Sequence, residues 1–252
     1  KPRLSIVNVS VWDGLGRILA RSVYASIDQP PFDRSAVDGY AVVAEDTYGA
    51  SHLNPVILRV KGVLKPGDKP CSASIVRGET VRVSTGAPLP RGADAVVMVE
   101  DVGEKNGFIE VYRPVSPWSN VSRRSEDYRS GELLVQENTL LKPWHLAIIA
   151  SSGIDEVLVY EKLRIGIVCS GSEVCEPGNK LDGGVYNSTG VLVKNYLDQH
   201  GFIETKYYGV YPDQPSVLRG VLEKALDENH GVVTCGGVGV SDVDVLILTR
   251  NK

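Results

Sequence analysis

Short apolar runs, separated by turns that contain glycine and proline, fill much of the first half of the chain. Between residues 45 and 135 they lie at 55–62, 79–86, 94–101 and 107–114. Runs of strand length with turn residues between them are typical of antiparallel strands. The pattern therefore predicts a small antiparallel β-barrel or sandwich in this region.

The pattern changes near residue 160, after a helix predicted over 140–157 from Pro143 in its first turn and Gly153 at its end. Apolar runs at 163–169, 205–211 and 231–235 then alternate with amphipathic segments at 188–201 and 213–231. This β-α-β-α-β order predicts a parallel sheet with right-handed crossovers. Ligands of such sheets bind at the carboxyl ends of the strands.

Composition narrows the class of protein. The 252 residues suffice for one large domain or two ordinary ones, and 42% hydrophobic residues can form a sizeable core. The net charge of −4 argues against a nucleic-acid-binding protein. The sequence has no apolar run of membrane-spanning length and no signal-peptide pattern, and it does not begin with Met. We therefore expect a trimmed cytoplasmic chain.

The four cysteines lack the close spacing of a zinc knuckle, so we expect reduced, buried or idle thiols. They are Cys71, Cys169, Cys175 and Cys235.

Glycines and acidic residues follow two of the predicted parallel strands. Gly171 comes after the run 163–169, and Gly236-Gly237 after the run 231–235. Bare glycine amides at strand ends can approach an anion closely. Glu173, Asp242 and Asp244 follow, and carboxylates beside an anion suit a divalent cation bound between them and phosphate. Tight turns with solvated acids are the alternative interpretation.

Two further segments carry possible ligand-binding groups. In "VSTGAPLPRGADAVVMVE" (83–100), Thr85 and Gly86 offer a hydroxyl and an amide to phosphate, or simply bend the chain. In "NVSRRSEDYRSGELL" (120–134), arginines lie beside Glu126 and Asp127. Such clusters are usually surface ion pairs of little energetic value, but the same residues would form a site if Arg faced a phosphate.

The segment "PPFDRSAVDGYAV" (30–42) concentrates charge on a stiff backbone. Its prolines fit a rigid connector, and Asp38-Gly39 fits a turn leading into a strand. This account leaves Asp33, Arg34 and Ser35 unexplained, so the segment indicates preorganisation for a ligand or partner.

Together with the tail "GIVCSGSEV…PG…VYNSTGVLV…GV.PD…VVTCGGVGVSDVD", these three segments resemble one family in the same order. They are similar to the molybdopterin molybdenumtransferases, the MoeA family, which includes the E domain of gephyrin. The similarity covers roughly residues 12 to 244.

The resemblance implies a multi-domain α+β and α/β protein. A barrel-like β domain (45–135) would be inserted in an elongated linker domain (1–44 plus 136–160). A three-layer parallel α/β domain of the molybdopterin-binding type (161–252) would follow. It would be incomplete, because the family continues with more of this domain and a C-terminal β domain, so we expect a longer native protein.

By resemblance, the protein is a transferase of molybdenum cofactor biosynthesis. It would insert molybdate, or tungstate, into adenylylated molybdopterin with Mg²⁺-dependent release of AMP. The alternative is a non-catalytic binding or scaffolding module on the same fold, like the gephyrin E domain. The resemblance also implies a homodimer whose active site is shared between protomers, with no nucleic-acid or membrane partner.

The family's functional positions are carried over residue by residue. The catalytic positions are Asp38, Thr85, Asp127 and Glu173. The substrate-binding positions are Ser35, Gly86, Arg123, Ser170, Gly171, Asp213, Gly236 and Gly237. The metal positions are Glu173 and Asp244. The family's "TGDE" loop reads "SGSE" here, so Ser172 stands where the family has Asp. Gly239 and Ser241 are likewise exchanged in type relative to the family's "GGVSVGxxD".

Overall fold

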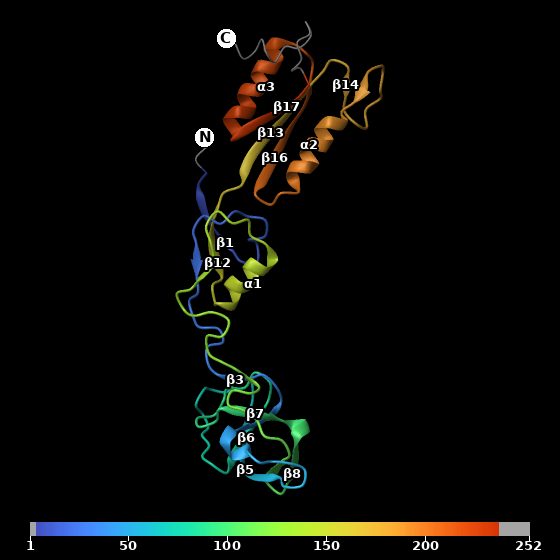
Figure 1. The fold of residues 1–252 in the computed structure, drawn as a ribbon. Helices are drawn as coiled ribbons and strands as arrows, with labels where there is room; N and C mark the ends of the chain where they lie inside the picture. The colour runs from blue at the N-terminus through green and yellow to red at the C-terminus, as the bar shows by residue number, and fades with distance from the viewer. Residues whose placement is uncertain (1–3, 237–252) are drawn as a thin grey trace. The chain divides into compact units, whose positions relative to one another are not determined.

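The computed structural model describes residues 4–236, which form parts of two compact units (Figure 1). Unit 1 contains the chain up to Val23, Val135–Ala150, and the residues from Ile154 onward. Unit 2 contains Tyr24–Leu134 and Ser151–Gly153. No helix within residues 4–236 is long and apolar enough to cross a membrane.

Unit 2 is built on a six-stranded sheet in the order β7-β4-β6-β5-β9-β8. Its strands are β4 (Gly39–Val42), β5 (Val56–Leu64), β6 (Glu79–Val83), β7 (Ala95–Met98), β8 (Val102–Lys105) and β9 (Phe108–Val111). The pairs are antiparallel, as predicted, except that β5 and β6 run parallel. The turn-rich segment 65–78 between them returns the chain to the starting end of β5 instead of closing a hairpin.

β4 lies second from one edge of this sheet, and all four of its residues are buried. Tyr40 and Val42 pack into one apolar cluster and Ala41 into another, as alternating side chains of a strand must when both faces are covered. The predicted boundary between residues 44 and 45 would assign β4 to the linker domain. The observed pairing places it between β6 and β7.

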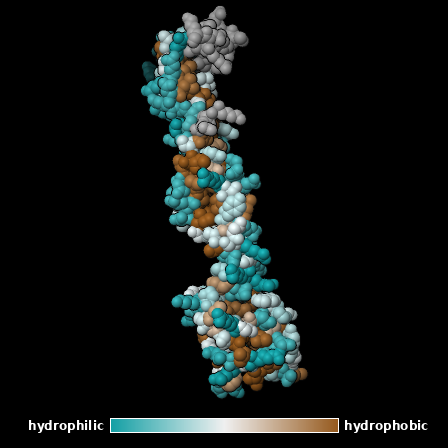
Figure 2. Space-filling model, turned by 90° about the vertical axis from the view of Figure 1, so that its left-hand side faces the viewer, coloured by the Kyte–Doolittle hydropathy of each residue, from teal (hydrophilic) through white to brown (hydrophobic). Residues whose placement is uncertain are grey.

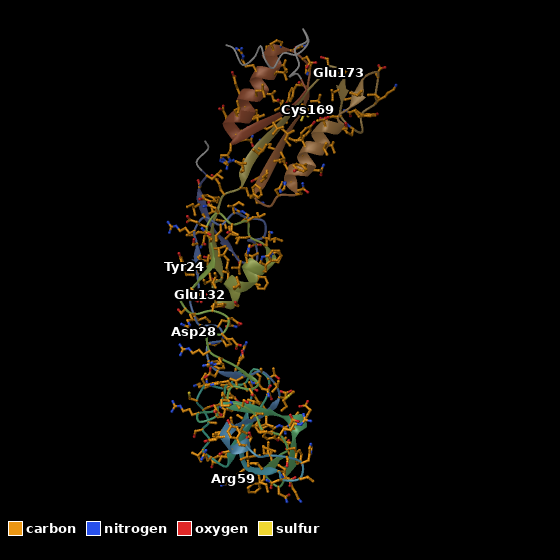
Figure 3. All side chains as sticks on the ribbon, viewed as in Figure 1. Tyr24, Asp28, Arg59, Glu132, Cys169 and Glu173 are labelled. Carbon is orange, nitrogen blue, oxygen red and sulfur yellow. The ribbon has the colours of Figure 1, made fainter. Side chains whose placement is uncertain are left out.

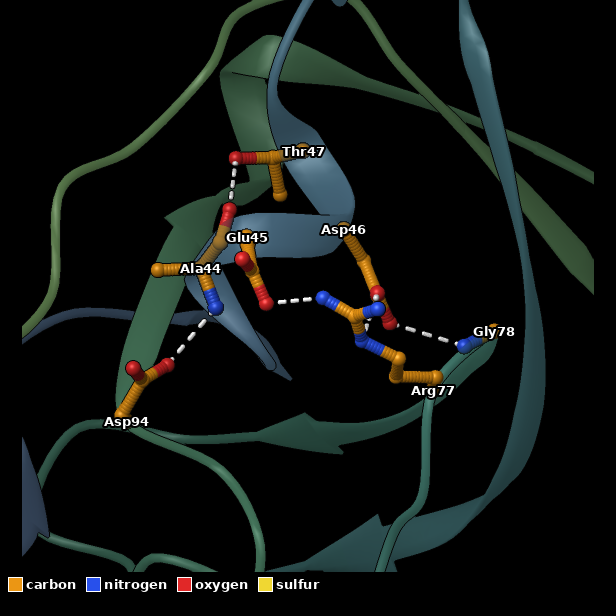
Figure 4. A network of polar contacts seen from close by, with 7 residues as sticks. All are labelled: Ala44, Glu45, Asp46, Thr47, Arg77, Gly78 and Asp94. Atoms are coloured by element: carbon orange, nitrogen blue, oxygen red, sulfur yellow. Dashed lines mark hydrogen bonds and ion pairs between the residues drawn. The ribbon is translucent and has the colours of Figure 1, made fainter.

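A polar network ties the 3₁₀ turn after β4, η1 (Ala44–Thr47), to two loops of the same unit (Figure 4). The Ala44 N–H donates to Asp94 at 2.7 Å, and the Gly78 N–H donates to Asp46 at 2.8 Å. Arg77 pairs with Glu45 and with Asp46. The Asp94 carboxylate satisfies a backbone N–H of the turn, and Glu45 and Asp46 anchor the turn to the loop at Arg77 and Gly78, so these contacts fix the chain where it leaves the sheet.

Short elements connect the two units and complete unit 2. They are β2 (Val23–Tyr24) paired with β11 (Leu133–Val135), β3 (Arg34–Ser35) paired with β10 (Val121–Ser122), and η2 (Val99–Asp101).

In unit 1, β1 (Ile6–Ser10) pairs antiparallel with β12 (Glu156–Tyr160), and α1 (Pro143–Ser151) precedes β12. The helix is shorter than the predicted 140–157. Leu140 and Leu141 are held in extended backbone by Ile18 and Arg17, and Gly153 at φ +79° separates the helix from β12. Hydrophobic surface is visible over this part of the unit in Figure 2, and an apolar cavity of about 430 Å³ lies between Trp12 and α1.

The remainder of unit 1 is the predicted parallel α/β arrangement. β13 (Leu163–Ser170) lies between β16 (Ile203–Tyr211) and β17 (Gly231–Cys235), parallel to both. α2 (Ser188–Asp198) packs on the Cys169 face, whereas α3 (Pro215–Glu228) covers Val168, so the helices lie on opposite faces. β14 (Val174–Cys175) and β15 (Val185–Tyr186) form a separate parallel pair. The fold class is confirmed.

Candidate functional site

The three motifs of unit 2 lie together around β3. Arg34 and Ser35 pair with Ser122 and Val121 of β10. On the other side, the Ser35 N–H donates to the Ala87 carbonyl at 2.9 Å. Segments 30–42, 84–89 and 120–127, far apart in the sequence, are therefore neighbours in the structure.

Asp38 and Thr85 meet directly in this cluster. Oδ1 of Asp38 accepts the Thr85 N–H at 2.8 Å and the Thr85 hydroxyl at 3.3 Å. Both residues are exposed. The structure thus brings two of the predicted catalytic residues together and leaves the other oxygen of the Asp38 carboxylate open to a ligand.

Ser35 is buried beneath the loop that carries Asp38. It is only 1% exposed, and its hydroxyl donates to the Val37 carbonyl at 2.6 Å. The Gly86 N–H donates to the Ser35 carbonyl at 2.8 Å. Ser35 therefore positions the loop that carries Asp38, and the Gly86 amide proposed for phosphate already has a backbone partner.

Gly39 is needed for close packing, not for a turn. The prediction of an Asp-Gly turn is wrong, because Gly39 begins β4, opposite Met98 and Val83, and its φ lies outside the left-handed region. A Cβ at this position would lie 2.2 Å from the Val97 carbonyl oxygen. The missing side chain lets β7 approach the backbone next to Asp38.

Neighbouring arginines in segment 120–134 have different roles. Arg124 pairs with Asp28 (Nη2–Oδ2, 2.6 Å), rather than with the Glu126 and Asp127 beside it. The Ser130 N–H, and after it the Arg124 guanidinium, lower the pKa of Asp28 below its usual value. Arg123 is exposed, and its guanidinium lies over the ring of Trp118. The guanidinium of Arg124 is already paired with Asp28, whereas the guanidinium of Arg123 remains available to a ligand.

Asp127 is exposed at the edge of the same cluster. Its N–H donates to the Gln29 carbonyl at 2.9 Å, which fixes its backbone beside the proline-rich start of segment 30–42.

In unit 1, the other predicted residues lie at the carboxyl end of the parallel sheet. The Gly171 N–H donates to the Tyr211 carbonyl at 3.1 Å, so the prediction of a free amide for an anion is wrong at this residue. Gly236, at φ +94°, passes so close to Ser170 that a Cβ would lie 2.3 Å from its carbonyl oxygen. The Ser170 hydroxyl is buried and has no hydrogen-bond partner within residues 4–236.

Ser172, which stands where the family has Asp, binds Asp213. The Ser172 N–H donates to Asp213 Oδ2 at 3.0 Å, and its hydroxyl accepts the Asp213 N–H at 3.2 Å. Oδ1 of Asp213 is buried and lacks a partner in the described part of the chain. From the sequence, Ser172 is only a residue that stands where the family has Asp. Its pairing with a residue 41 positions away could not be read from the local pattern.

Glu173 lies beyond the end of β13 (Figure 3). It lines a pocket of about 590 Å³ formed by residues from 171–184 and 210–212. Nearby, Tyr207 donates a hydrogen bond to Glu176 and accepts one from Asn187. Burial, and after it the bond to Glu176, raises the pKa of Tyr207. The phenol therefore stays protonated and acts as a structural link beside the pocket.

Cys169 and Cys235 lie opposite each other on β13 and β17, and all four cysteines are free thiols. Burial, and next the neighbouring Cys169, raises the pKa of Cys235 to about 11.

Residues 4–236 contain no group of three or more His, Cys, Asp or Glu side chains arranged to hold a metal ion. Five of the residues singled out from the sequence lie outside the described part of the chain: Gly237, Gly239, Ser241, Asp242 and Asp244.

Comparison with known proteins gives matches along almost the whole chain. The family described as MoeA N-terminal region (domain I and II) matches residues 2–153, and that described as a probable molybdopterin binding domain matches residues 166–251. A putative molybdopterin biosynthesis protein of Methanocaldococcus jannaschii is 37% identical over 97% of this chain and 61% of its own length. A molybdopterin molybdenumtransferase of Staphylococcus epidermidis is 32% identical over 95% of this chain and 57% of its own.

Solved structures that resemble this chain agree with these family matches. Two crystal structures of the molybdopterin biosynthesis MoeA protein of Pyrococcus horikoshii resemble this chain, with TM-scores of 0.78 and 0.83 and identities of 38% and 35%. The alignments cover 93% and 91% of this chain but 60% and 61% of those proteins. The chain thus spans about three fifths of the length of the relatives it matches.

Proposed function

The chain belongs to the MoeA family, and on that premise we propose that its protein acts in molybdenum cofactor biosynthesis as a molybdopterin molybdenumtransferase. The substrates would be adenylylated molybdopterin and molybdate, or tungstate, and AMP would be released. The names of the relatives support this assignment for the family. The observation that carries it in this chain is the contact between Asp38 and Thr85.

In the proposed reaction, the residues of unit 2 position the substrate. Asp38 is held by the Thr85 amide, so its carboxylate is fixed before a ligand arrives. A fixed carboxylate can orient the hydrated oxyanion or accept a proton from it without reorganisation during the reaction. The exposed guanidinium of Arg123 offsets phosphate charge.

The strand-end groups of unit 1 would hold the anionic part of the substrate and Mg²⁺. The Ser170 hydroxyl and Asp213 Oδ1, which have no hydrogen-bond partner within residues 4–236, could supply oxygen ligands, with Glu173 on the adjoining pocket. Hard oxygen donors suit Mg²⁺, which keeps several waters and takes few protein carboxylates. When bound, Mg²⁺ would neutralise charge on the phosphates. Ser172 holds the Asp213 carboxylate in place for this role.

The experiment follows AMP release by the full-length protein from adenylylated molybdopterin, molybdate and Mg²⁺. Asp38→Asn keeps an oxygen that can accept the Thr85 N–H but removes the charge, so we expect release to fall about 100-fold or more without loss of folded protein. Asp227→Asn, which removes one exposed carboxylate on α3, is the matched control and should release AMP normally. Substrate binding without AMP release by the unmodified protein would favour the scaffolding alternative.

We also propose that the protein is a homodimer whose protomers share each active site. Two variants defective in different units, Asp38→Asn and Asp213→Asn, should each be inactive alone. Mixed and reassembled, they should recover about one quarter of normal activity if half the dimers are mixed and each contains one intact site. A monomer in light scattering, or no recovery in mixed dimers, would contradict this arrangement.

A further inference from the structure

The side chain of Arg123 rests on the aromatic ring of Trp118, which lies just before the segment 120–134. Its Cζ atom lies 4.5 Å from the centroid of the Trp118 ring. Trp118 is 40% exposed, so the pair lies at the surface of unit 2. A guanidinium over an indole face is attracted by the ring's electrons, and the contact leaves the N–H groups at the guanidinium edge able to donate to an anion.

Trp118 occupies a backbone conformation that is unfavourable for a bulky residue. Its φ is +68°, in the left-handed region where Gly or Asn is usual. The N–H donates to the Asp94 carbonyl at 2.6 Å, and the carbonyl accepts the Val121 N–H at 3.3 Å. These bonds fix the conformation from both sides. A large aromatic residue kept in such a conformation points to a use for its side chain.

The backbone around Arg123 is fixed too. Its N–H donates to the Glu126 carboxylate at 2.9 Å, and its carbonyl accepts the Glu126 N–H at 3.1 Å. The next N–H, of Arg124, donates to Asp33 at 2.8 Å. The mobile part of Arg123 is therefore its long side chain, and the indole restricts that side chain.

We propose that Trp118 is a positioning residue that holds the Arg123 guanidinium ready for a phosphate group of the ligand. This inference rests on the proposed function, in which Arg123 faces substrate phosphate. Without the ring, the ligand must order a flexible arginine as it binds, and the entropic cost of that ordering weakens affinity. Trp118 acts through Arg123 and need not touch the ligand.

The test titrates inorganic pyrophosphate into the full-length protein by calorimetry. Trp118→Leu keeps an apolar side chain but removes the aromatic face, and we expect binding to weaken about three- to fivefold. Trp118→Phe, which restores an aromatic face at the same position, should stay within about twofold of the natural protein. Equal losses in the two variants would mean that the ring serves packing alone and would overturn the proposal.

Both substitutions are repeated in an Arg123→Gln background. There, Trp118→Leu should have no further effect on pyrophosphate affinity, because the group that it positions is gone. A persistent loss would overturn the positioning role while leaving the proposed function standing. If Arg123→Gln alone leaves pyrophosphate affinity unchanged, the assignment of Arg123 fails, and this inference with it. The measurement of AMP release by the Asp38→Asn protein tests the proposed function separately.

A second measurement leaves Trp118 intact. The chain has three tryptophans, so Trp12→Phe with Trp144→Phe makes Trp118 the only fluorescent indole of this chain. Pyrophosphate should change its emission when Arg123 is present and leave it unchanged in the Arg123→Gln protein. An emission change that survives Arg123→Gln, or no change in either protein, would contradict the coupling.

Discussion

Replacing Gly39 by alanine should destabilise unit 2 strongly, although the added group is one methyl. The new Cβ would lie 2.2 Å from the Val97 carbonyl oxygen and 2.7 Å from a methyl group of Val96. Gly39 does not have a left-handed φ, so backbone strain contributes nothing, and the whole cost comes from this contact. One of the two clashing groups is backbone, which cannot rotate away.

The magnitude follows from the displacement. Ordinary contact begins at 3.4 Å, so β7 would have to move away from β4 by about 1.2 Å. Ladder hydrogen bonds near 2.9 Å would then exceed 3.5 Å and be lost. Overpacking costs about 1–3 kcal/mol, and each lost bond about 1 kcal/mol. We expect a loss of about 3 kcal/mol in the free energy of unfolding, or roughly 10 °C in the thermal midpoint.

The assay is hydrogen exchange in urea, read on the peptides that contain β4 and β7, so that unit 2 is measured separately. Gly62→Ala is the matched control. Gly62 lies in β5 of the same sheet, and its Cβ would meet no atom within 4 Å. Gly62→Ala should raise the free energy of unfolding by about 0.5–1 kcal/mol, because alanine loses less backbone freedom than glycine on folding. Equal effects of the two substitutions would refute the close-approach argument.

Three further predictions concern stability. Thr47→Val removes a buried hydroxyl that donates to Ala44 and accepts from Val115, and should cost about 2 kcal/mol by urea denaturation, whereas Thr47→Ser should cost less. The pKa of Asp28 is lowered in the folded protein. Its carboxylate therefore contributes to folding stability above pH 3.8, and this contribution is lost as the pH falls through the pKa of the folded state. Asp28→Asn should therefore reduce the fall in urea midpoint between about pH 5 and pH 3. Leu218→Ala, at a fully buried position of α3, should cost about 2–5 kcal/mol. An unchanged urea midpoint in Leu218→Ala would contradict this last prediction.

The alternating strands and helices of unit 1 were predictable because their signals are local. The strand 231–235 is observed with the predicted bounds, since an apolar run and flanking glycines define it. The helix predicted over 213–231 is observed at Pro215–Glu228, beginning at the proline that suits a first turn. Hydrophobic periodicity and end signals sufficed where each element is specified by its own residues.

The sequence predicted less well wherever distant segments decide the structure. The parallel pairing of β5 with β6 depends on the path of segment 65–78, which contains no helix to signal a crossover. The roles of Trp118 and Ser172 depend on partners that local patterns do not reveal. Motif similarity grouped Asp38 with Thr85, and their hydrogen bond confirms that they are neighbours.

The pairing of remote segments around β3 has a consequence for how the protein acquires its ligand site. Asp38 and Thr85 are 47 residues apart in sequence, and the bond from Arg124 to Asp33 spans 91 residues. Contacts of such separation form late and slowly, because a long loop must close before they stabilise the chain. A nascent or partly folded chain would thus lack the cluster altogether. The contacts that bring Asp38 and Thr85 together would therefore appear only when the folding of unit 2 is complete.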